Sequence, residues 1–364
     1  MIQSLIHWVA EKHEVLVLAI IAFFGLIETL GGFYANSKRN RDDVLIETFN
    51  TFMLMVFTKP LIVFATISAL NWAVPSTDGA LSLLPFFVSL VGFLLVDDFL
   101  QYWYHRFAHE YKWLWKLHRA HHTATELGLM VSYRNAIYYY MLMPNIWWLG
   151  IATYFLGGVP VAVGIVLKQV VIVSSHSLVT WDSFFHRRPW LKPVLRLIER
   201  IVVTPAFHHA HHAVSKIDGV GNPNGNFGNM LSIWDQMFSS ASFSHAFPTA
   251  YGIPNDPQDG WAVQSLYPLI KSNQPDSELS ANYQFKSTKV NEPAVMTLQP
   301  GDYLYCACGY SRNQPFCDGS HHGTGYQPVK FTVERQKQYR LCQCKLCVHA
   351  PYCDNSHQKA TRAE

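Results

Sequence analysis

Long apolar runs limit what the N-terminal half of this chain can fold into. Residues 15–34, 45–74 and 81–104 carry almost no charge, and each is close to or longer than the roughly 20 residues that a membrane-spanning helix needs. Residues 137–155 and 159–173 follow and predict a helical hairpin, either spanning or re-entrant. The sequence therefore predicts a mainly α, multi-spanning helical membrane domain.

Charged residues in the first and second runs bear on how those helices are expected to lie. Glu28 lies in the first run, and we expect it near a helix end or facing another helix. Lys59 and Pro60 interrupt the second run, where the proline predicts a kink.

Composition and charge agree with a membrane protein. Only 15% of the 364 residues are charged, against roughly 25% in a typical soluble domain, and the net charge is +3. No Lys/Arg stripe is present, so we expect no nucleic-acid partner. Lys38, Arg39 and Arg41 follow the first run and predict a cytoplasmic loop by the positive-inside rule. The first run has no signal-peptide pattern and predicts a retained anchor, with the bacterial inner membrane as the expected location.

Three histidine clusters follow the third apolar run, and the predicted topology puts all of them on the cytoplasmic face. They are HRFAH with His105 and His109, LHRAHH with His118, His121 and His122, and FHHAHH with His208, His209, His211 and His212. Histidines four apart on a helix share one face. A single zinc ion uses three or four protein ligands, so this number of imidazoles predicts two metal ions. Iron, zinc, copper and nickel all suit neutral imidazole.

Asp98 shares a helical face with Gln101, Tyr102, His105 and His109. A carboxylate there can accept the ring N–H of a ligand histidine, or it can be a polar residue near a helix end. The neighbouring Asp97 points elsewhere, and we expect it to be structural.

The three motifs, in this order and between apolar runs, resemble the fatty acid hydroxylase/sterol desaturase superfamily of membrane di-iron oxygenases. The resemblance covers residues 15–240, including NFGNMLSIWDQMF after the third cluster. It implies two non-haem irons held by His105, His109, His118, His121, His122, His208, His211 and His212. The pattern does not require His209. The family has a further histidine between the second and third motifs, for which His176 fits best and His186 is the alternative.

The resemblance implies O2-dependent hydroxylation or desaturation of a lipid such as a sterol or fatty acyl chain. We expect the lipid among helices that carry Tyr138, Tyr139, Tyr140, Trp147 and Trp148, although such aromatics are also interface anchors. No GxGxxG motif is present, so the electrons are expected from an external reductase. The competing interpretation is a non-catalytic, membrane-tethered iron–sulfur protein with a structural metal at the histidines.

All seven cysteines follow residue 300, in two repeated blocks. The blocks are CACGYSRNQPFCDGSH, with Cys306, Cys308, Cys317 and His321, and CQCKLCVHAPYCDNSH, with Cys342, Cys344, Cys353 and His357. Three thiolates and one imidazole also suit zinc by ligand count. Both blocks resemble the CDGSH motif, which implies two 2Fe–2S clusters in a small β-rich domain. The second block departs from the motif at Asn355, and Cys347 is left as a spare thiol.

The predicted organisation is a membrane domain over residues 1–240, loop and linker over 241–292, and the CDGSH-type domain over 293–364. A tethered cluster domain can deliver electrons to an oxygenase because the tether raises its effective concentration. Histidine ligation raises the potential of such a cluster and weakens it as a reductant, so redox or iron sensing is the alternative role.

Overall fold

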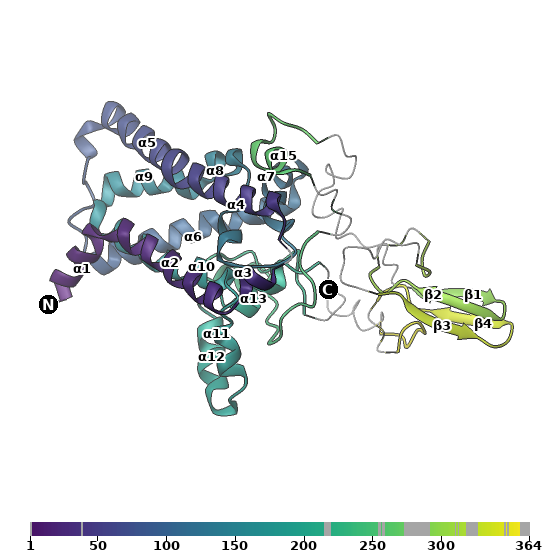
Figure 1. Ribbon diagram of the computed structural model, residues 1–364. Helices are drawn as coiled ribbons and strands as arrows, with labels where there is room; N and C mark the ends of the chain where they lie inside the picture. The colour runs from purple at the N-terminus through teal and green to yellow at the C-terminus, as the bar shows by residue number, and fades with distance from the viewer. Residues whose placement is uncertain are drawn as a thin grey trace.

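The computed structural model describes a helical part followed by a small β part (Figure 1). It describes residues 2–37, 39–214, 220–253, 256, 259–272, 292–309, 311, 313–317, 327–345, 347 and 349–356. The described residues are mainly α-helical, and their strands lie near the C-terminus, as predicted.

The helices of the N-terminal half are α1 (Ile2–Glu11), α2 (His13–Leu30), α3 (Phe33–Asn36), α4 (Arg41–Phe52), the π-helix η1 (Met53–Thr58), α5 (Lys59–Ala73), η2 (Pro75–Thr77), α6 (Phe86–Glu110) and α7 (Lys112–His122). Those that follow are η3 (Leu129–Tyr133), α8 (Ile137–Leu142), α9 (Pro144–Leu156), α10 (Gly158–His176), α11 (Trp181–His186), η4 (Pro189–Leu191), α12 (Lys192–Glu199), α13 (Pro205–His211), α14 (Ile233–Met237) and α15 (Trp261–Leu266). The strands are β1 (Ala294–Leu298), β2 (Gly301–Tyr305), β3 (Val329–Val333) and β4 (Lys337–Leu341).

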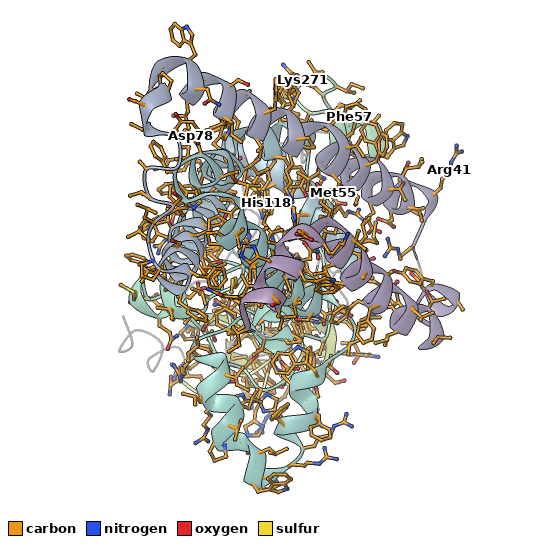
Figure 2. All side chains as sticks on the ribbon, turned by 90° about the vertical axis from the view of Figure 1, so that its left-hand side faces the viewer. Arg41, Met55, Phe57, Asp78, His118 and Lys271 are labelled. Carbon is orange, nitrogen blue, oxygen red and sulfur yellow. The ribbon has the colours of Figure 1, made fainter. Side chains whose placement is uncertain are left out.

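Four helical stretches of the described chain are long and apolar enough to cross a membrane. They are His13–Leu30, Arg41–Ala73, Phe86–Glu110 and Gly158–His176. Their outer faces are apolar: Leu18, Leu61 and Phe64 are 65%, 62% and 70% exposed. Figure 2 shows Phe57 and Arg41 projecting from these helices, while His118 lies inside. A lipid-facing exterior around a polar interior is the arrangement that a bilayer requires.

The hairpin predicted for residues 137–173 has a different form. Its second arm is the full-length helix α10, but its first arm is divided at Met143 and Pro144 into α8 and α9. These helices have 6 and 13 residues, so neither is long enough to span alone. The break arises because Pro144 offers no backbone N–H and disfavours a helical conformation for the preceding residue.

The interruption at Lys59 and Pro60 is a π-helical segment within one continuous helical stretch. The backbone N–H of Lys59 bonds to the carbonyl of Leu54, five residues earlier. Pro60 has no N–H to continue the ladder, and the wider turn accommodates this gap before α5 begins. The segment contributes Leu54 and Met55 to the interior cavity described below.

Buried polar contacts and close packing hold the helices together. Glu28, 3% exposed, accepts hydrogen bonds from the backbone N–H of Leu129 and from Ser177 Oγ, at 3.1 and 2.8 Å. It therefore lies near the end of α2 and faces other segments, as expected. Helix α10 approaches α6 so closely that a Cβ at Gly164 would lie 2.6 Å from the ring of Phe93. Only glycine fits at this contact.

Part of the predicted loop and linker packs against the helices. Arg119 on α7 forms ion pairs with Asp256 and with Asp259, the latter at 2.8 Å. Helix α15 contacts α4 and α7, and the ring of Trp261 lies 5.3 Å from that of Phe49. The described residues between 241 and 272 thus pack against the helical part, beyond the predicted domain boundary at residue 240. The contacts of this segment combine ion pairs with apolar contacts such as that between Trp115 and Ile253, and no regular sequence pattern marks them.

The β part consists of two antiparallel pairs. Strand β1 pairs with β4, and β2 pairs with β3. Leu298, Tyr305, Val333 and Leu341 form the centre of its small core, together with Cys342 and Cys344. The β-rich character predicted for the C-terminal region is confirmed.

Candidate metal centre

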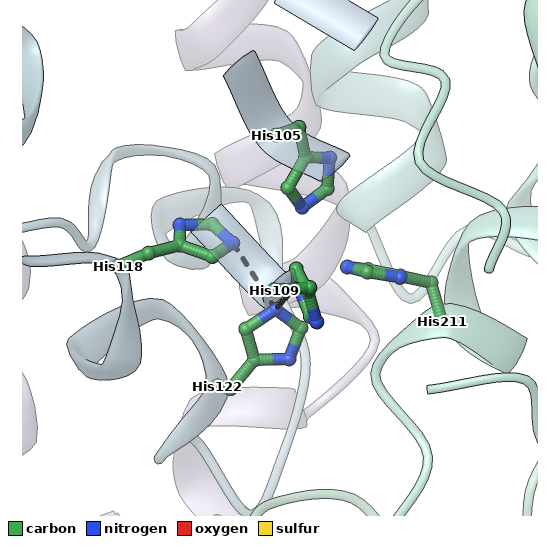
Figure 3. A group of neighbouring side chains, drawn as sticks. All are labelled: His105, His109, His118, His122 and His211. Carbon is green, nitrogen blue, oxygen red and sulfur yellow. Dashed lines mark hydrogen bonds between the residues drawn. The ribbon is translucent and has the colours of Figure 1, made fainter. Parts of the chain in front are cut away.

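Nine histidines form two adjoining groups inside the helical part. The first group comprises His105, His109, His118, His122 and His211 (Figure 3), and the second comprises His121, His176, His208 and His212. Within each group the candidate ligand atoms lie within 4.8 Å of one another. The rings of His122 and His212 stack at 4.7 Å and connect the groups. All nine side chains predicted as ligands are present in the two groups.

The spacing of the ring nitrogens fits metal ligation. His109 Nε2 and His122 Nε2 are 3.1 Å apart, and His176 Nε2 and His208 Nε2 are 2.8 Å apart. His212 Nε2 lies 3.1 Å from His208 Nε2. Two nitrogens bound to one ion at about 2.1 Å, at angles between a right angle and the tetrahedral angle, are separated by about 3 Å. The nitrogens therefore have the spacing that a shared ion requires.

The outer nitrogens of several rings are held by fixed oxygen acceptors. His105 Nδ1 donates to the carbonyl of Phe227 at 2.8 Å, and His211 Nδ1 donates to that of Gly225 at 2.8 Å. His118 Nδ1 donates to Asn135 Oδ1 at 2.7 Å. His121 and His176 donate to the carbonyls of Val131 and Ile172. A proton fixed on Nδ1 leaves the Nε2 lone pair directed into the group.

The electrostatic environment keeps the rings neutral. Burial lowers the pKa of His118, His121, His122, His208, His211 and His212 well below the usual value, and neighbouring histidines lower it further. Each of these side chains is at most 4% exposed. A neutral imidazole has one ring nitrogen with a free lone pair, which is the form that binds a metal ion. The donor set is all nitrogen, which suits a transition metal such as iron or zinc.

The helical positions divide the sequence motifs between the two groups. On α6, His105 and His109 are one turn apart and both enter the first group. On α7, His118 and His122 enter the first group while His121 enters the second. The third motif likewise contributes His211 to the first group and His208 and His212 to the second. Each metal position therefore draws on more than one motif.

A short loop behind the first group is anchored by two buried carboxylates. Asp98 accepts the backbone N–H groups of Met230 and Leu231, both at 2.9 Å, and Trp234 Nε1 at 3.1 Å. Asp235 accepts the N–H groups of Phe227 and Gly228 at 2.8 and 2.7 Å. Burial, the largest effect, raises the pKa of Asp235 to about 6. These bonds fix the loop whose carbonyls hold His105 and His211.

Of the two alternatives for Asp98, acceptance of a ring N–H from a ligand histidine is not observed, because its oxygens bind the loop instead. The acceptor beside His105 is the Phe227 carbonyl. Asp98 affects His105 indirectly, because it fixes the loop that contains this carbonyl. Asp97, expected to be structural, pairs with Lys168. The roles of Asn135 and of the backbone carbonyls were missed, since a carbonyl leaves no signal in a sequence. The Gly/Asn turns at residues 224–229 were the only available indication.

Two histidines that the sequence analysis singled out lie outside both groups. His209 Nδ1 lies 3.0 Å from Tyr251 Oη, and its ring packs against Phe247. His186, the alternative to His176, stacks on His245 at 4.5 Å beside Glu199. His176 is thus the histidine between the second and third motifs that joins the centre.

A cavity of about 170 Å³ adjoins both groups. His105, His118, His121, His176 and His208 form its histidine wall. Its other walls are apolar side chains such as Phe93, Tyr139, Tyr140, Ile146 and Leu149, and polar ones such as Lys59, Asp97, Asn145, Lys168 and Gln169. Among the aromatics predicted near a substrate, Tyr139 and Tyr140 line this cavity. Trp147 is 42% exposed and donates to the carbonyl of Met141 instead.

The cysteine blocks repeat each other in structure as in sequence. Cys306 and Cys308 have their sulfurs 3.6 Å apart, and so do Cys342 and Cys344. The N–H of Cys306 bonds to the carbonyl of Pro315, and that of Cys342 bonds to the carbonyl of Pro351. Cys317 and Cys353 follow equivalent isolated bridges, Tyr305–Phe316 and Leu341–Tyr352. His321 and His357 lie outside the described residues.

The second block differs from the prediction in one respect. The sulfur group within 4.8 Å consists of Cys342, Cys344 and Cys347, whereas Cys353 was expected as the third thiolate and Cys347 as the spare. Cys347 is only three residues beyond Cys344, so its thiol stays beside the pair. The N–H of Asp354 bonds to its sulfur at 3.5 Å.

The chain has membrane-length helices around a buried group of histidines, followed by a cysteine-rich β tail. These features define a two-part membrane metalloprotein. Comparison with known families places each part. Residues 90–240 match the fatty acid hydroxylase family, and residues 274–322 match the iron-binding zinc finger CDGSH type. The chain thus combines a fatty acid hydroxylase domain with a C-terminal CDGSH domain, as the motifs indicated.

Individual relatives match each part separately. The alkylglycerol monooxygenase of Danio rerio is 27% identical over 171 residues, which are 46% of this chain and 33% of the relative. The human alkylglycerol monooxygenase is 27% identical over 145 residues, 39% of this chain and 28% of the relative. The mitochondrial CDGSH iron-sulfur domain-containing protein 3 of Mus musculus is 56% identical over 34 residues, 9% of this chain and 25% of the relative. The chain thus covers at most a third of these relatives.

The chain is also similar to a solved structure. The crystal structure of the human mitochondrial inner NEET protein is 34% identical, with 21% of this chain and 88% of that chain covered and a TM-score of 0.20.

Proposed function

We propose that this chain is an O2-dependent membrane hydroxylase that oxidises a C–H bond of a lipid at a pair of irons. The observation that carries the proposal is that histidines of both groups line one cavity with apolar walls. A lipid in that cavity would lie directly beside both metal positions. The match to the fatty acid hydroxylase family supports iron as the metal.

The residues of each group would hold one iron. His105, His109, His118, His122 and His211 would bind the first, and His121, His176, His208 and His212 would bind the second. When bound, an iron pair supplies the reductive activation of O2. The chain's own part is to fix the ring orientations through oxygen acceptors such as Asn135 and the Phe227 carbonyl. Phe93, Ile146 and Leu149 exclude water from the substrate side.

The polar side of the cavity favours a lipid with a polar group close to the reacting carbon. Lys59 and the Asp97–Lys168 ion pair line the cavity together with Asn145 and Gln169. Charged residues inside membrane helices are costly, so their presence at a cavity indicates contact with a polar ligand. Because three relatives are named alkylglycerol monooxygenase, ether lipids of the alkylglycerol type are the first candidates. Hydroxylation rather than desaturation is favoured for the same reason.

The tail would supply electrons to this centre. Two 2Fe–2S clusters are proposed, with ligands Cys306, Cys308, Cys317 and His321 in the first block and Cys342, Cys344, Cys353 and His357 in the second. The third thiolate of the second block has Cys347 as its structural alternative. A separate reductase would reduce the tail. Both domains would lie at the cytoplasmic face of a bacterial inner membrane, and the arginines after α3 support the cytoplasmic orientation by the positive-inside rule.

The proposal is tested by turnover under labelled oxygen. The full chain in lipid nanodiscs is supplied with a chemical reductant and an alkylglycerol, with a free fatty acid in a parallel reaction. Mass spectrometry should detect one labelled oxygen atom in a lipid product, and replacing His211 with alanine should abolish it. Product without label, or labelled product that persists without His211, would refute the proposal.

A further inference from the structure

A buried lysine distinguishes the second cysteine block from the first. The residue after the second cysteine is Gly309 in the first block and Lys345 in the second, 36 residues later. Both have left-handed backbone conformations, with φ of +82° and +61°. Glycine adopts this conformation freely, whereas a lysine rarely does. The second block therefore has a lysine where the backbone conformation favours glycine.

The ammonium of Lys345 reaches across to the other block. Its Nζ lies 4.1 Å from the centre of the Tyr305 ring, and Tyr305 immediately precedes Cys306. Lys345 is 7% exposed, and among the described residues its Nζ has no hydrogen-bond partner. The reverse contact cannot form, because Gly309 has no side chain and Leu341 stands where the first block has Tyr305. One cation thus lies between two otherwise repeated blocks.

The charge of this lysine interacts with the sulfurs of both blocks. Burial lowers the pKa of Lys345, whereas Cys306, Cys342, Cys308 and Cys344 oppose that shift. Tyr305 lies near sulfurs of both blocks. Burial is the largest effect that raises its pKa, and the nearby Cys342 raises it further. A buried ammonium without a counter-charge is unfavourable, and thiolate-ligated clusters would supply negative charge on both sides.

We propose that Lys345 is one cation shared by the two cluster sites, and that its charge raises the reduction potential of both clusters. This inference rests on the proposed loading of the tail with 2Fe–2S clusters. Each cluster takes up one electron from the reductant and becomes more negative by one charge. The ammonium stabilises that added charge without itself being oxidised, reduced or deprotonated. Lys345 is therefore a tuning residue and not a ligand.

The test is a redox titration of the full, cluster-loaded chain. Iron and sulfide are measured first, and the clusters are then reduced stepwise with dithionite under argon while their EPR and visible spectra are recorded. Lys345→Met removes the charge and keeps the length of the side chain, and Lys345→Arg keeps the charge. Lys345→Gly installs the first block's residue and also relieves the backbone. Lys337→Met is the control, since Lys337 is an exposed lysine of the same domain.

Lys345→Met and Lys345→Gly should each disfavour reduction of both clusters about tenfold, equal to about 59 mV for one electron. Lys345→Arg and Lys337→Met should leave both potentials near the wild-type values. Unchanged potentials in loaded Lys345→Met, or a shift confined to one cluster, would overturn the shared cation but not the hydroxylase. If the Lys345→Met variant does not bind its clusters, the reduction potentials of Lys345→Gly and Lys345→Arg are compared instead. Zinc in the wild-type tail would overturn this inference and the proposed electron delivery together.

Discussion

The ring of His105 donates its Nδ1 hydrogen to the carbonyl oxygen of Phe227, across 122 residues of sequence and at 2.8 Å. This bond joins the first histidine motif on α6 to the loop that follows the third motif. Because the loop also holds His211 through Gly225, its backbone positions two candidate ligands of the same metal.

The first prediction concerns Gly228, in the loop next to Phe227. A Cβ at this position would lie 2.6 Å from the Leu231 carbonyl and 2.8 Å from Asp235 Oδ2, so the backbone must shift. Gly228→Ala should move the Phe227 carbonyl away from His105 and lower iron affinity about 10–100-fold. Competition with an iron chelator measures this. Gly92→Ala is the matched control, since a Cβ there meets nothing within 4 Å. Equal affinities in the two variants would contradict the positioning role.

The second prediction concerns Asp98 as an anchor. Asp98 is fully buried and accepts three hydrogen bonds from the segment 230–234. Asp98→Ala should lower the free energy of unfolding by about 3 kcal/mol or more, because buried donors lose a charged acceptor. Unfolding in detergent, followed by circular dichroism, measures the change. Glu110→Ala removes an exposed i,i+4 pair with Arg106 and should change it by less than about 0.5 kcal/mol. An Asp98 variant as stable as this control would show that the anchor is dispensable.

The third prediction separates adjacent histidines of one motif. His211 belongs to the first group, whereas His209 is directed to Tyr251. His211→Ala should lose at least one iron per chain and all lipid oxidation. His209→Ala should retain both irons, because only a hydrogen bond and a ring contact are removed. Metal content by mass spectrometry distinguishes the two variants, and iron loss from His209→Ala alone would reverse the assignment.

The fourth prediction concerns the polar wall of the cavity. Lys59→Met removes a charge from the cavity and keeps the apolar part of the side chain. The KM for a lipid with a polar head should rise about tenfold with little change in kcat, because a charged hydrogen bond contributes about 1.5 kcal/mol to binding in ground and transition states alike. Lys192→Met, at an exposed position outside this cavity, is the control. A fall in kcat without a rise in KM would argue against substrate binding by Lys59.

Regular spacing made the histidines predictable. His105 and His109 are one helical turn apart, so their common direction followed from the sequence. The division of His118, His121 and His122 between two groups could not be predicted from the sequence. It depends on where α10 and α13 meet α7. The same limit applies to the backbone carbonyls of Gly225 and Phe227, which the sequence does not distinguish from any others.

Charge pairs were the least predictable feature of the fold. Arg119 bonds to Asp259 across 140 residues, and nothing in either local sequence indicates the pairing. The segment after residue 240 was therefore predicted as loop and linker, although its described residues contact α4 and α7. The partners of Asp98 were unpredictable for a related reason. Its position on the histidine face was correct, but its hydrogen-bond donors came from a distant loop.

The most direct test is to identify the metals of the full chain. Protein purified without oxygen is analysed for iron, zinc and acid-labile sulfide, and Mössbauer spectra are recorded before and after reduction with dithionite. We predict two irons without sulfide that behave as a coupled pair, and the loss of at least one of them in His211→Ala. We also predict four irons with sulfide in the tail. Zinc at the histidine groups, with iron confined to the tail, would contradict the oxygenase and leave a membrane-tethered redox protein.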